Sequence, residues 1–315
     1  MHDKATLERL YRSLYRIRRV EEEVARAYPT DKIKSPVHLS IGQESISVGA
    51  CEALRPDDVA FGTYRSHALY LARGGNLPAM IAELYGKATG CAKGKGGSMH
   101  LIAPDVNVMG ASAVVGTTIP HAVGYAYALK LRQTDRVVLC MFGDGATEEG
   151  VFYESLNYAS LKQLPIIFLC ENNGYAIHTH VLRRQLLANL CDRAKSFNIP
   201  AEQIADGDVL KVRERMQAIV AGVRAGQGPY FLECLTYRWK EHVGPGEDWQ
   251  LGYRTATEAE PWKQNDQVPR LAGLLAEADR DRVHREVEAE IAAAFHFAEQ
   301  SPFPAPAELW EHVYQ

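Results

Sequence analysis

A carboxylate and a side-chain amide follow two neighbouring apolar runs of this sequence. Gly143-Asp144-Gly145 closes the first run, Asn172-Asn173 closes the second, and 26 residues lie between the two motifs. Parallel strands end at one edge of a sheet, so we expect Asp144 and Asn173 to lie side by side at that edge. Oxygen ligands of this kind suit a hard cation that carries a diphosphate, and flanking glycines allow close approach.

The elements that must position this pair form a strand–helix–strand crossover. Residues 136–142 and 165–171 are mostly apolar and do not alternate polar with apolar residues, which is typical of strands that are buried on both faces. Between them, residues 148–163 carry apolar side chains along one side of a predicted helix. The chain is therefore predicted to be a doubly wound α/β protein. Its sheet should be mostly parallel, with helical extensions, and residues 1–315 should form a single domain.

Periodicity and turn residues predict the remaining elements. Helices are expected at 6–28, 42–51, 77–86, 117–132, 208–225 and over most of 270–299. Strands are expected at 57–66 and 229–236, whereas residues 178–206 should be irregular or partly helical. Loop 240–254 is rich in glycine, proline and charge. The tail from Pro302 to Pro306 cannot be helical and needs a surface to pack on.

Composition and charge exclude several classes of protein. Of the 315 residues, 46% are hydrophobic and 23% are charged, which is ordinary for a globular protein. A formal charge of −4 without a basic block argues against nucleic acid or an anionic membrane as a partner. No apolar stretch approaches the ~18–20 residues of a membrane span. The six cysteines form no CxxC pair, and Cys140 and Cys170 fall in the two buried strands, so we expect core thiols and a cytoplasmic protein.

Four further motifs narrow the assignment. They are His38-Leu-Ser-Ile-Gly-Gln-Glu44, Thr63-Tyr64-Arg65-Ser66-His67, Gly94-Lys-Gly-Gly-Ser-Met-His100 and Glu171-Asn-Asn-Gly-Tyr175. With the Gly-Asp-Gly and Asn-Asn pair, they resemble the alpha subunit of the thiamine-diphosphate-dependent decarboxylating component of 2-oxo acid dehydrogenase complexes, of the pyruvate and acetoin types. The resemblance runs from about residue 7 to the C-terminus, with the motifs in family order.

The resemblance implies a role for individual residues. A magnesium ion would be held by Asp144, Asn173 and the backbone carbonyl of Tyr175. Catalytic roles would fall to His38 and His242. Contacts to thiamine diphosphate would come from Tyr64, Arg65, Ala113, Val115, Gly143, Asp144, Gly145, Asn173, Tyr175 and His242. The structural alternatives are a helix cap for Asp144, a surface ion pair for Arg65, a solvated loop position for His242 and a capping or core role for His38.

The family also implies partners. The glutamate that activates the cofactor's aminopyrimidine belongs to a second module, for which this chain has no room, so a beta subunit is expected in a heterotetramer of two alpha and two beta chains. The acyl group would pass to the lipoyl arm of an acyltransferase component. The substrate would be a 2-oxo acid or acetoin. Other hypotheses are a non-oxidative thiamine enzyme, either split transketolase-like or an acyl-transferring synthase, and a cofactor-free interaction subunit. The intact metal pair argues against the last.

Several positions depart from the family pattern or mimic other motifs. Ala113 stands where relatives usually have glycine, and Lys240 and Val243 replace a histidine and a phosphorylated serine of mitochondrial members. Residues 90–98 resemble a phosphate loop with the wrong spacing, and we expect a crossing loop at a subunit contact. His178 and His180 are expected in a polar loop. We further expect Asp144 to be an exposed carboxylate, and Glu247 and Asp248 to be repelled by an empty metal site.

Overall fold

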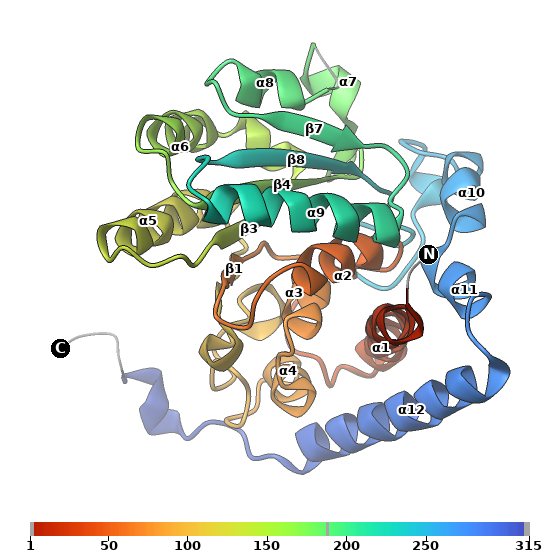
Figure 1. The fold of residues 1–315 in the computed structure, drawn as a ribbon. Helices are drawn as coiled ribbons and strands as arrows, with labels where there is room; N and C mark the ends of the chain where they lie inside the picture. Colours follow the sequence, from red (N-terminus) through yellow and green to blue (C-terminus); the bar gives the residue numbers. More distant parts are fainter. Residues whose placement is uncertain (1–2, 187–188, 312–315) are drawn as a thin grey trace.

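The computed structural model describes residues 3–186 and 189–311, and a parallel sheet lies at the centre of this part of the chain (Figure 1). The sheet has six strands in the order β2-β1-β3-β4-β8-β7, and every neighbouring pair is parallel. Its strands are β1 (Val59–Phe61), β2 (Val108–Gly110), β3 (Val138–Gly143), β4 (Ile166–Asn172), β7 (Ala201–Ile204) and β8 (Tyr230–Leu235). The predicted doubly wound α/β class is confirmed.

Helices cover both faces of this sheet, which explains why its central strands are apolar throughout. On one face lie α5 (Thr118–Leu131) and α6 (Gly150–Leu161), and on the other lie α2 (Glu44–Glu52) and α9 (Val209–Arg224) (Figure 1). Along β3, Cys140 and Phe142 pack with the first pair of helices, whereas Leu139 and Met141 pack with the second pair. Each central strand therefore packs against a hydrophobic core on both of its faces, so its apolar residues do not alternate with polar ones.

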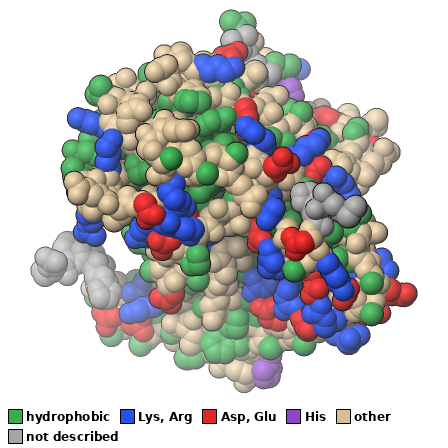
Figure 2. Space-filling view, in the orientation of Figure 1, with side chains coloured by type: hydrophobic (Ala, Val, Ile, Leu, Met, Phe, Trp, Pro, Cys, Tyr) green, Lys and Arg blue, Asp and Glu red, His purple; other side chains and the backbone are tan. Residues whose placement is uncertain are grey.

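A further helical layer packs below α2 in Figure 1. It contains α1 (Lys4–Ala27), α3 (His67–Ala72), α4 (Leu77–Leu84) and α12 (Glu277–Gln300), with α10 (Ala256–Gln264) and α11 (Gln267–Ala272) leading into α12. Asp3 caps α1 by accepting the Thr6 N–H at 2.9 Å, as expected for an N-cap carboxylate. Basic and acidic side chains are interspersed over the face shown in Figure 2. Ion pairs join α1 to α12, as in Arg16–Glu290 at 2.6 Å.

Short elements were the ones that sequence periodicity missed or misplaced. Residues 178–206 contain an edge strand, β7, and the small elements β6 (Thr179–His180), α7 (Val181–Arg184) and α8 (Cys191–Lys195), whereas residues 187 and 188 lie outside the described residues. β6 pairs with β5 (Tyr175–Ala176) in an antiparallel hairpin. The strand expected at 57–66 is confined to β1. Loop 240–254 contains a single 3₁₀ turn, Trp249–Leu251, and the tail turns only at Pro306–Leu309.

The remaining expectations concern cysteines and membrane segments. All six cysteines are free thiols, and Cys140 and Cys170 are fully buried in the sheet, which confirms their assignment as core residues. Among the described residues, no helix combines the length and the apolar character that crossing a bilayer requires.

Candidate active site

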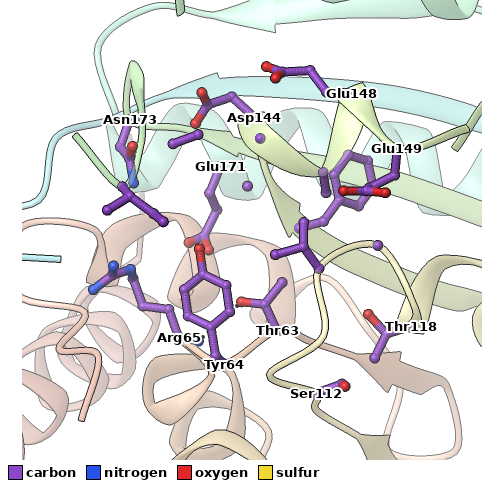
Figure 3. A pocket seen from close by; sticks show the side chains of 18 of the residues that line it. Thr63, Tyr64, Arg65, Ser112, Thr118, Asp144, Glu148, Glu149, Glu171 and Asn173 are labelled. Atoms are coloured by element: carbon purple, nitrogen blue, oxygen red, sulfur yellow. Dashed lines mark hydrogen bonds between the residues drawn. The ribbon is translucent and has the colours of Figure 1, made fainter. Parts of the chain in front are cut away.

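The register of β3 against β4 brings the predicted pair to one sheet edge. Gly143 lies opposite Glu171, so Asp144 and Asn173 follow at the carboxyl ends of adjacent parallel strands. A cavity of about 250 Å³ opens there, and both side chains line it (Figure 3). Tyr64 and Arg65 reach the same cavity from the segment that follows β1. The expected juxtaposition is confirmed, because carboxyl ends of parallel strands meet at one edge of a sheet.

Asp144 is buried, and the expectation of an exposed carboxylate is wrong. Only 1% of its side chain is exposed, and Arg184 of α7 donates to its Oδ2. Asp144 begins a 3₁₀ turn, Asp144–Glu148, and α7 folds back over this turn. Burial raises the pKa of Asp144, and the neighbouring Arg184 charge opposes that shift.

The turn after β4 is held by its own side chains. The Tyr175 N–H donates to Asn173 Oδ1 at 3.1 Å, and Asn173 Nδ2 donates to Gln43 Oε1 at 3.0 Å. The Gly174 N–H donates to Asn172 Oδ1 at 2.9 Å, and Gly174 has φ +82°, a conformation that glycine adopts without strain. The amide oxygen of Asn173 and the carbonyl of Tyr175 therefore belong to one rigid turn.

A buried glutamate that sequence analysis did not single out supports this turn from below. Glu233 of β8 accepts from Asn172 Nδ2 at 2.7 Å. It also accepts from Gln203 Nε2 at 2.8 Å and from the Leu190 N–H at 3.1 Å. Its donors are neutral groups from three separate segments. Glu233 thereby ties the turn that follows β4 to the edge of the sheet.

Two histidines lie beside the Tyr64-Arg65 segment. The His38 ring is 4.5 Å from the Tyr64 ring and 5.1 Å from the His242 ring, measured between centroids. Arg65 donates to the carbonyls of Leu39 at 2.7 Å and His242 at 3.2 Å, so it connects the two histidine segments. Burial, with the nearby Arg65 charge, lowers the pKa of His38 and of His242 to about 3. Both imidazoles are neutral at pH 7, and neither lines the cavity itself.

The remaining predicted contacts differ in their surroundings. A Cβ on Gly145 would lie 3.0 Å from the Ala176 Cβ, whereas a Cβ on Gly143 would make only an ordinary contact, 4.0 Å from the Glu171 carbonyl oxygen. Both glycines line the cavity. Val115 is 43% exposed at the cavity rim, and Ala113 is half-buried next to that rim without lining it. Packing is therefore tighter at position 145 than at position 143.

Three further acidic residues line the cavity, and none of them was predicted. They are Glu148, Glu149 and Glu171, which appear with Asp144 in Figure 3. Burial raises the pKa of Glu171 to about 8, although the Arg65 charge opposes this shift. A diphosphate could enter so acidic a cavity only with a cation. Among the described residues, no group of three His, Cys, Asp or Glu side chains is placed to hold a metal alone. The oxygen donors present suit magnesium that takes further ligands from a phosphate.

Loop 240–254 is organised by a buried ion network, not by the cavity. Asp248 pairs with Arg254 at 2.7 Å and with Arg238 at 3.3 Å, and all three side chains are buried. The expectation that Asp248 is repelled by an empty metal site is therefore wrong. Glu247 instead accepts from the Trp249 indole at 2.9 Å. Each carboxylate of this loop has its own partner within the loop or in the segment between β8 and the loop.

The glycine-rich loop carries an anion of the protein itself. The carboxylate of Glu83 is fully buried and accepts four backbone N–H groups, from Ala92, Gly94, Gly96 and Gly97, at 2.7–2.9 Å. The loop therefore has the donor pattern of an anion nest, and its occupant is a side chain. This arrangement explains the resemblance to a phosphate loop and leaves no room for a phosphate.

Three further histidines, His67, His178 and His180, have structural partners. His67 is fully buried between Glu21 at 2.9 Å and Ser98 Oγ at 2.8 Å. This Ser-His-Glu row has no access to solvent. His180 Nδ1 accepts from the Leu182 N–H at 3.2 Å and caps α7, and His178 lies against the Tyr253 ring at 4.5 Å. These contacts agree with the expected polar loop.

Comparison with known proteins finds one family and several similar proteins. Residues 12–307 match the family described as dehydrogenase E1 component. The alpha subunit of acetoin:2,6-dichlorophenolindophenol oxidoreductase from Bacillus subtilis is 36% identical over 310 residues, which cover 97% of this chain and 92% of that protein. The pyruvate dehydrogenase E1 component subunit alpha from Zymomonas mobilis is 37% identical over 319 residues, covering 99% of this chain and 89% of that protein. The alpha subunit of acetoin:2,6-dichlorophenolindophenol oxidoreductase from Cupriavidus necator is 36% identical over 319 residues, which cover 99% of this chain and 95% of that protein.

Proposed function

This chain belongs to the dehydrogenase E1 component family, and on that premise we propose that it is the alpha subunit of a thiamine-diphosphate-dependent 2-oxo acid or acetoin dehydrogenase. One observation carries the proposal. Asp144 and the Asn173–Tyr175 turn lie at one sheet edge, with Arg65 lining the same cavity. Residues 1–315 would act together as a single diphosphate-binding domain.

The oxygen donors at the sheet edge would hold magnesium. Asp144, the Asn173 amide oxygen and the Tyr175 carbonyl supply three hard ligands, and phosphate oxygens would complete the shell. Arg65 and Tyr64 would bind the diphosphate from the opposite wall, where a guanidinium fork fits phosphate oxygens. Bound thiamine diphosphate supplies the electron sink for cleavage of a bond next to a carbonyl. The chain itself contributes binding, orientation and charge compensation.

His38 and His242 are suited to hydrogen-bond acceptance. Both are neutral at pH 7, because burial and the Arg65 charge disfavour the imidazolium. The Nδ1 atom of His38 is buried and has no hydrogen-bond partner among the described residues. A buried acceptor without a donor is costly, so a group of the substrate or cofactor would satisfy it. We propose His38 on the substrate side and His242 toward the diphosphate.

A second chain would complete this site. The cavity of about 250 Å³ is smaller than the ~300–1,000 Å³ of typical small-molecule sites. Apolar side chains are exposed at its rim, with Val114 at 62% and Val115 at 43%. We propose that a beta subunit covers this rim, in an assembly of two alpha and two beta chains, and that Ala113 and Val115 meet the cofactor there. A lipoyl acyltransferase would accept the acyl group. The free cysteines support a reducing compartment, and we propose the cytoplasm.

The test is an assay of the chain co-purified with its beta subunit. Reduction of 2,6-dichlorophenolindophenol would be followed with pyruvate, longer 2-oxo acids and acetoin, with and without thiamine diphosphate and magnesium. We expect reduction with one of these substrate classes, only when both are present and only with the beta subunit. Full activity of the alpha chain alone would contradict the proposal. Substrate consumption without dye reduction would favour the alternative, a non-oxidative thiamine enzyme.

A further inference from the structure

A cation of the protein already occupies the metal-binding carboxylate. Arg184, on α7, donates from Nη2 to Asp144 Oδ2 and from Nη1 to Glu148 Oε1. Its Nε donates to the Thr179 carbonyl at 2.9 Å. Only 9% of the Arg184 side chain is exposed. The guanidinium is therefore docked by three acceptors and is not a mobile surface charge.

The burial of Asp144 explains why such a partner is needed. A carboxylate that is 1% exposed cannot be solvated by water, and an uncompensated buried charge is strongly unfavourable. In the chain without metal, Arg184 supplies the compensating charge. A magnesium ion bound by Asp144 would supply the same compensation. Two cations next to one carboxylate repel each other, so they are alternatives.

We propose that Arg184 is the resident counter-ion of Asp144 in the cofactor-free chain, and that magnesium must displace it to bind. This inference rests on the proposed function, because it assumes that the metal uses Asp144. After displacement, Arg184 keeps an acceptor: Glu148 is at the cavity wall and one-third exposed. Breaking one of its two ion pairs therefore does not leave the guanidinium buried without a partner.

The alternative role, a second diphosphate-binding arginine, is disfavoured by the geometry. Both terminal nitrogens of Arg184 point to carboxylates of the Asp144–Glu148 turn, and Arg184 does not line the cavity. Arg65 does line the cavity, and its terminal nitrogens meet the Leu39 carbonyl and His242 but no carboxylate of the described residues. The charge of Arg65 is thus available to a phosphate in the cavity, whereas Arg184 is directed at Asp144, the proposed metal ligand.

The chain couples Arg184 to the other metal ligands. The Val181 N–H at the start of α7 donates to the Gly174 carbonyl at 2.7 Å, so α7 is attached to the Asn173–Tyr175 turn. Between them, the hairpin turn holds Ile177 at φ +53°, a strained conformation for a β-branched residue. Arg238 donates to the Ile177 carbonyl at 2.9 Å and holds this turn in place. Arg184 and two of the proposed metal ligands, Asn173 and Tyr175, thus lie within one short, constrained segment.

The experiment compares Arg184→Gln with Arg183→Gln in the assembly with the beta subunit, stripped of cofactor and metal. Arg183 is exposed on the same helix, so its variant controls for the change in net charge. The probes are magnesium chloride alone, followed by thermal unfolding, and thiamine diphosphate titrated by calorimetry at a series of magnesium concentrations. If Arg184 occupies Asp144 about nine-tenths of the time, R184Q should lower the half-saturating magnesium concentration about tenfold. R184Q should also melt earlier than wild type without metal and regain stability with magnesium alone.

Three outcomes are decisive. An unchanged or higher half-saturating magnesium concentration in R184Q, with normal wild-type binding, would overturn this inference and leave the proposed function intact. A wild-type assembly that binds thiamine diphosphate without any dependence on magnesium would instead overturn the proposed metal site. If R184Q does not fold, Arg184→Lys retains the charge without the guanidinium fork, and it should show a smaller decrease in the same direction. A lysine variant identical to wild type would then count against the inference.

Discussion

Two buried carboxylates of this protein, Glu83 and Asp144, are held in opposite ways. Glu83 is fully buried and accepts four backbone N–H groups of the glycine-rich loop. Asp144 is equally buried, but its charge is compensated by the side chain of Arg184. Backbone donors cannot leave without unfolding the loop, whereas a side chain can rotate away. Burial alone therefore does not distinguish a structural carboxylate from one that a ligand can reach. The distinction depends on whether the group that compensates the carboxylate can move away.

The local backbone explains how the Glu83 site closes. Gly94 and Gly97 have φ of +75° and +62°, so successive N–H groups can converge on one point. A Cβ on Gly94 would lie 2.7 Å from the backbone of Gly86, which excludes any other residue there. The glycines thus serve the fit of the loop around Glu83. Beside Asp144 the restriction is weaker, because a Cβ on Gly145 would meet only the Ala176 side chain, at 3.0 Å.

Removing the Glu83 side chain is expected to have the largest effect. Glu83→Ala leaves four buried N–H groups without an acceptor, at a cost of about 4 kcal/mol in the free energy of unfolding. Urea unfolding of the assembly measures it. Glu83→Gln keeps one acceptor oxygen and should lose roughly half as much. Thiamine-diphosphate affinity of the folded protein should stay unchanged in both. A loss below about 1 kcal/mol in the alanine variant would show that water replaces the carboxylate.

Asp144→Ala should show the reverse pattern. Magnesium-dependent thiamine-diphosphate affinity should fall by at least about 100-fold, because a buried charge partner of the bound group is lost. Stability should change little, since Arg184 retains Glu148. Calorimetric titration and urea unfolding of the same preparation measure both quantities. Unchanged cofactor affinity would remove Asp144 from the metal site, and a stability loss as large as that of the Glu83 variant would erase the contrast between the two carboxylates.

Glu233 should fall between these cases, because it is fully buried like Glu83 but supports the metal-ligand turn. Glu233→Gln leaves one of its donors, Asn172, Gln203 or the Leu190 N–H, facing an amide nitrogen. We expect magnesium to bind about tenfold more weakly, as for other residues that orient metal ligands. Gln203→Ala, which removes a donor that belongs to β7 and not to the turn itself, is the matched control. Equal effects of the two substitutions would indicate a purely structural role for Glu233.

The smallest effect should appear in the pH dependence of stability. The pKa of His38 is about 3 in the folded chain, against an ordinary value near 6.5, so the unfolded chain binds the proton more strongly. The contribution of the neutral His38 imidazole to the free energy of unfolding is fully present above pH 6.5. It is lost as the pH falls from 6.5 toward 3. His38→Gln should therefore recover on the order of 1 kcal/mol of the loss between pH 7 and 5.5. Parallel pH profiles of variant and wild type would contradict the buried, neutral state of His38.

The central crossover and the ligand pair could be predicted from sequence because their signals are local. Continuous apolar runs mark β3 and β4, and the residues that follow each run must emerge at the same edge. β7 gave no such signal, since this edge strand is half-exposed and reads Ala-Glu-Gln-Ile. The boundaries of short strands such as β1 depend on pairing with neighbours that lie far away along the chain. Periodicity alone cannot report that pairing.

The sequence by itself determined which residues could carry the chemistry: Asp144, Asn173, Tyr64 and Arg65, in family order and spacing. Only the tertiary structure decided their environment. It buried Asp144, gave it Arg184 as a partner 40 residues further along the chain, and added Glu171 to the same cavity. It also set Glu233 beneath Asn172, across a separation of 61 residues. Such partnerships depend on how strands and loops from distant segments pack. The charge state and accessibility of a side chain follow from that packing and not from its neighbours in sequence.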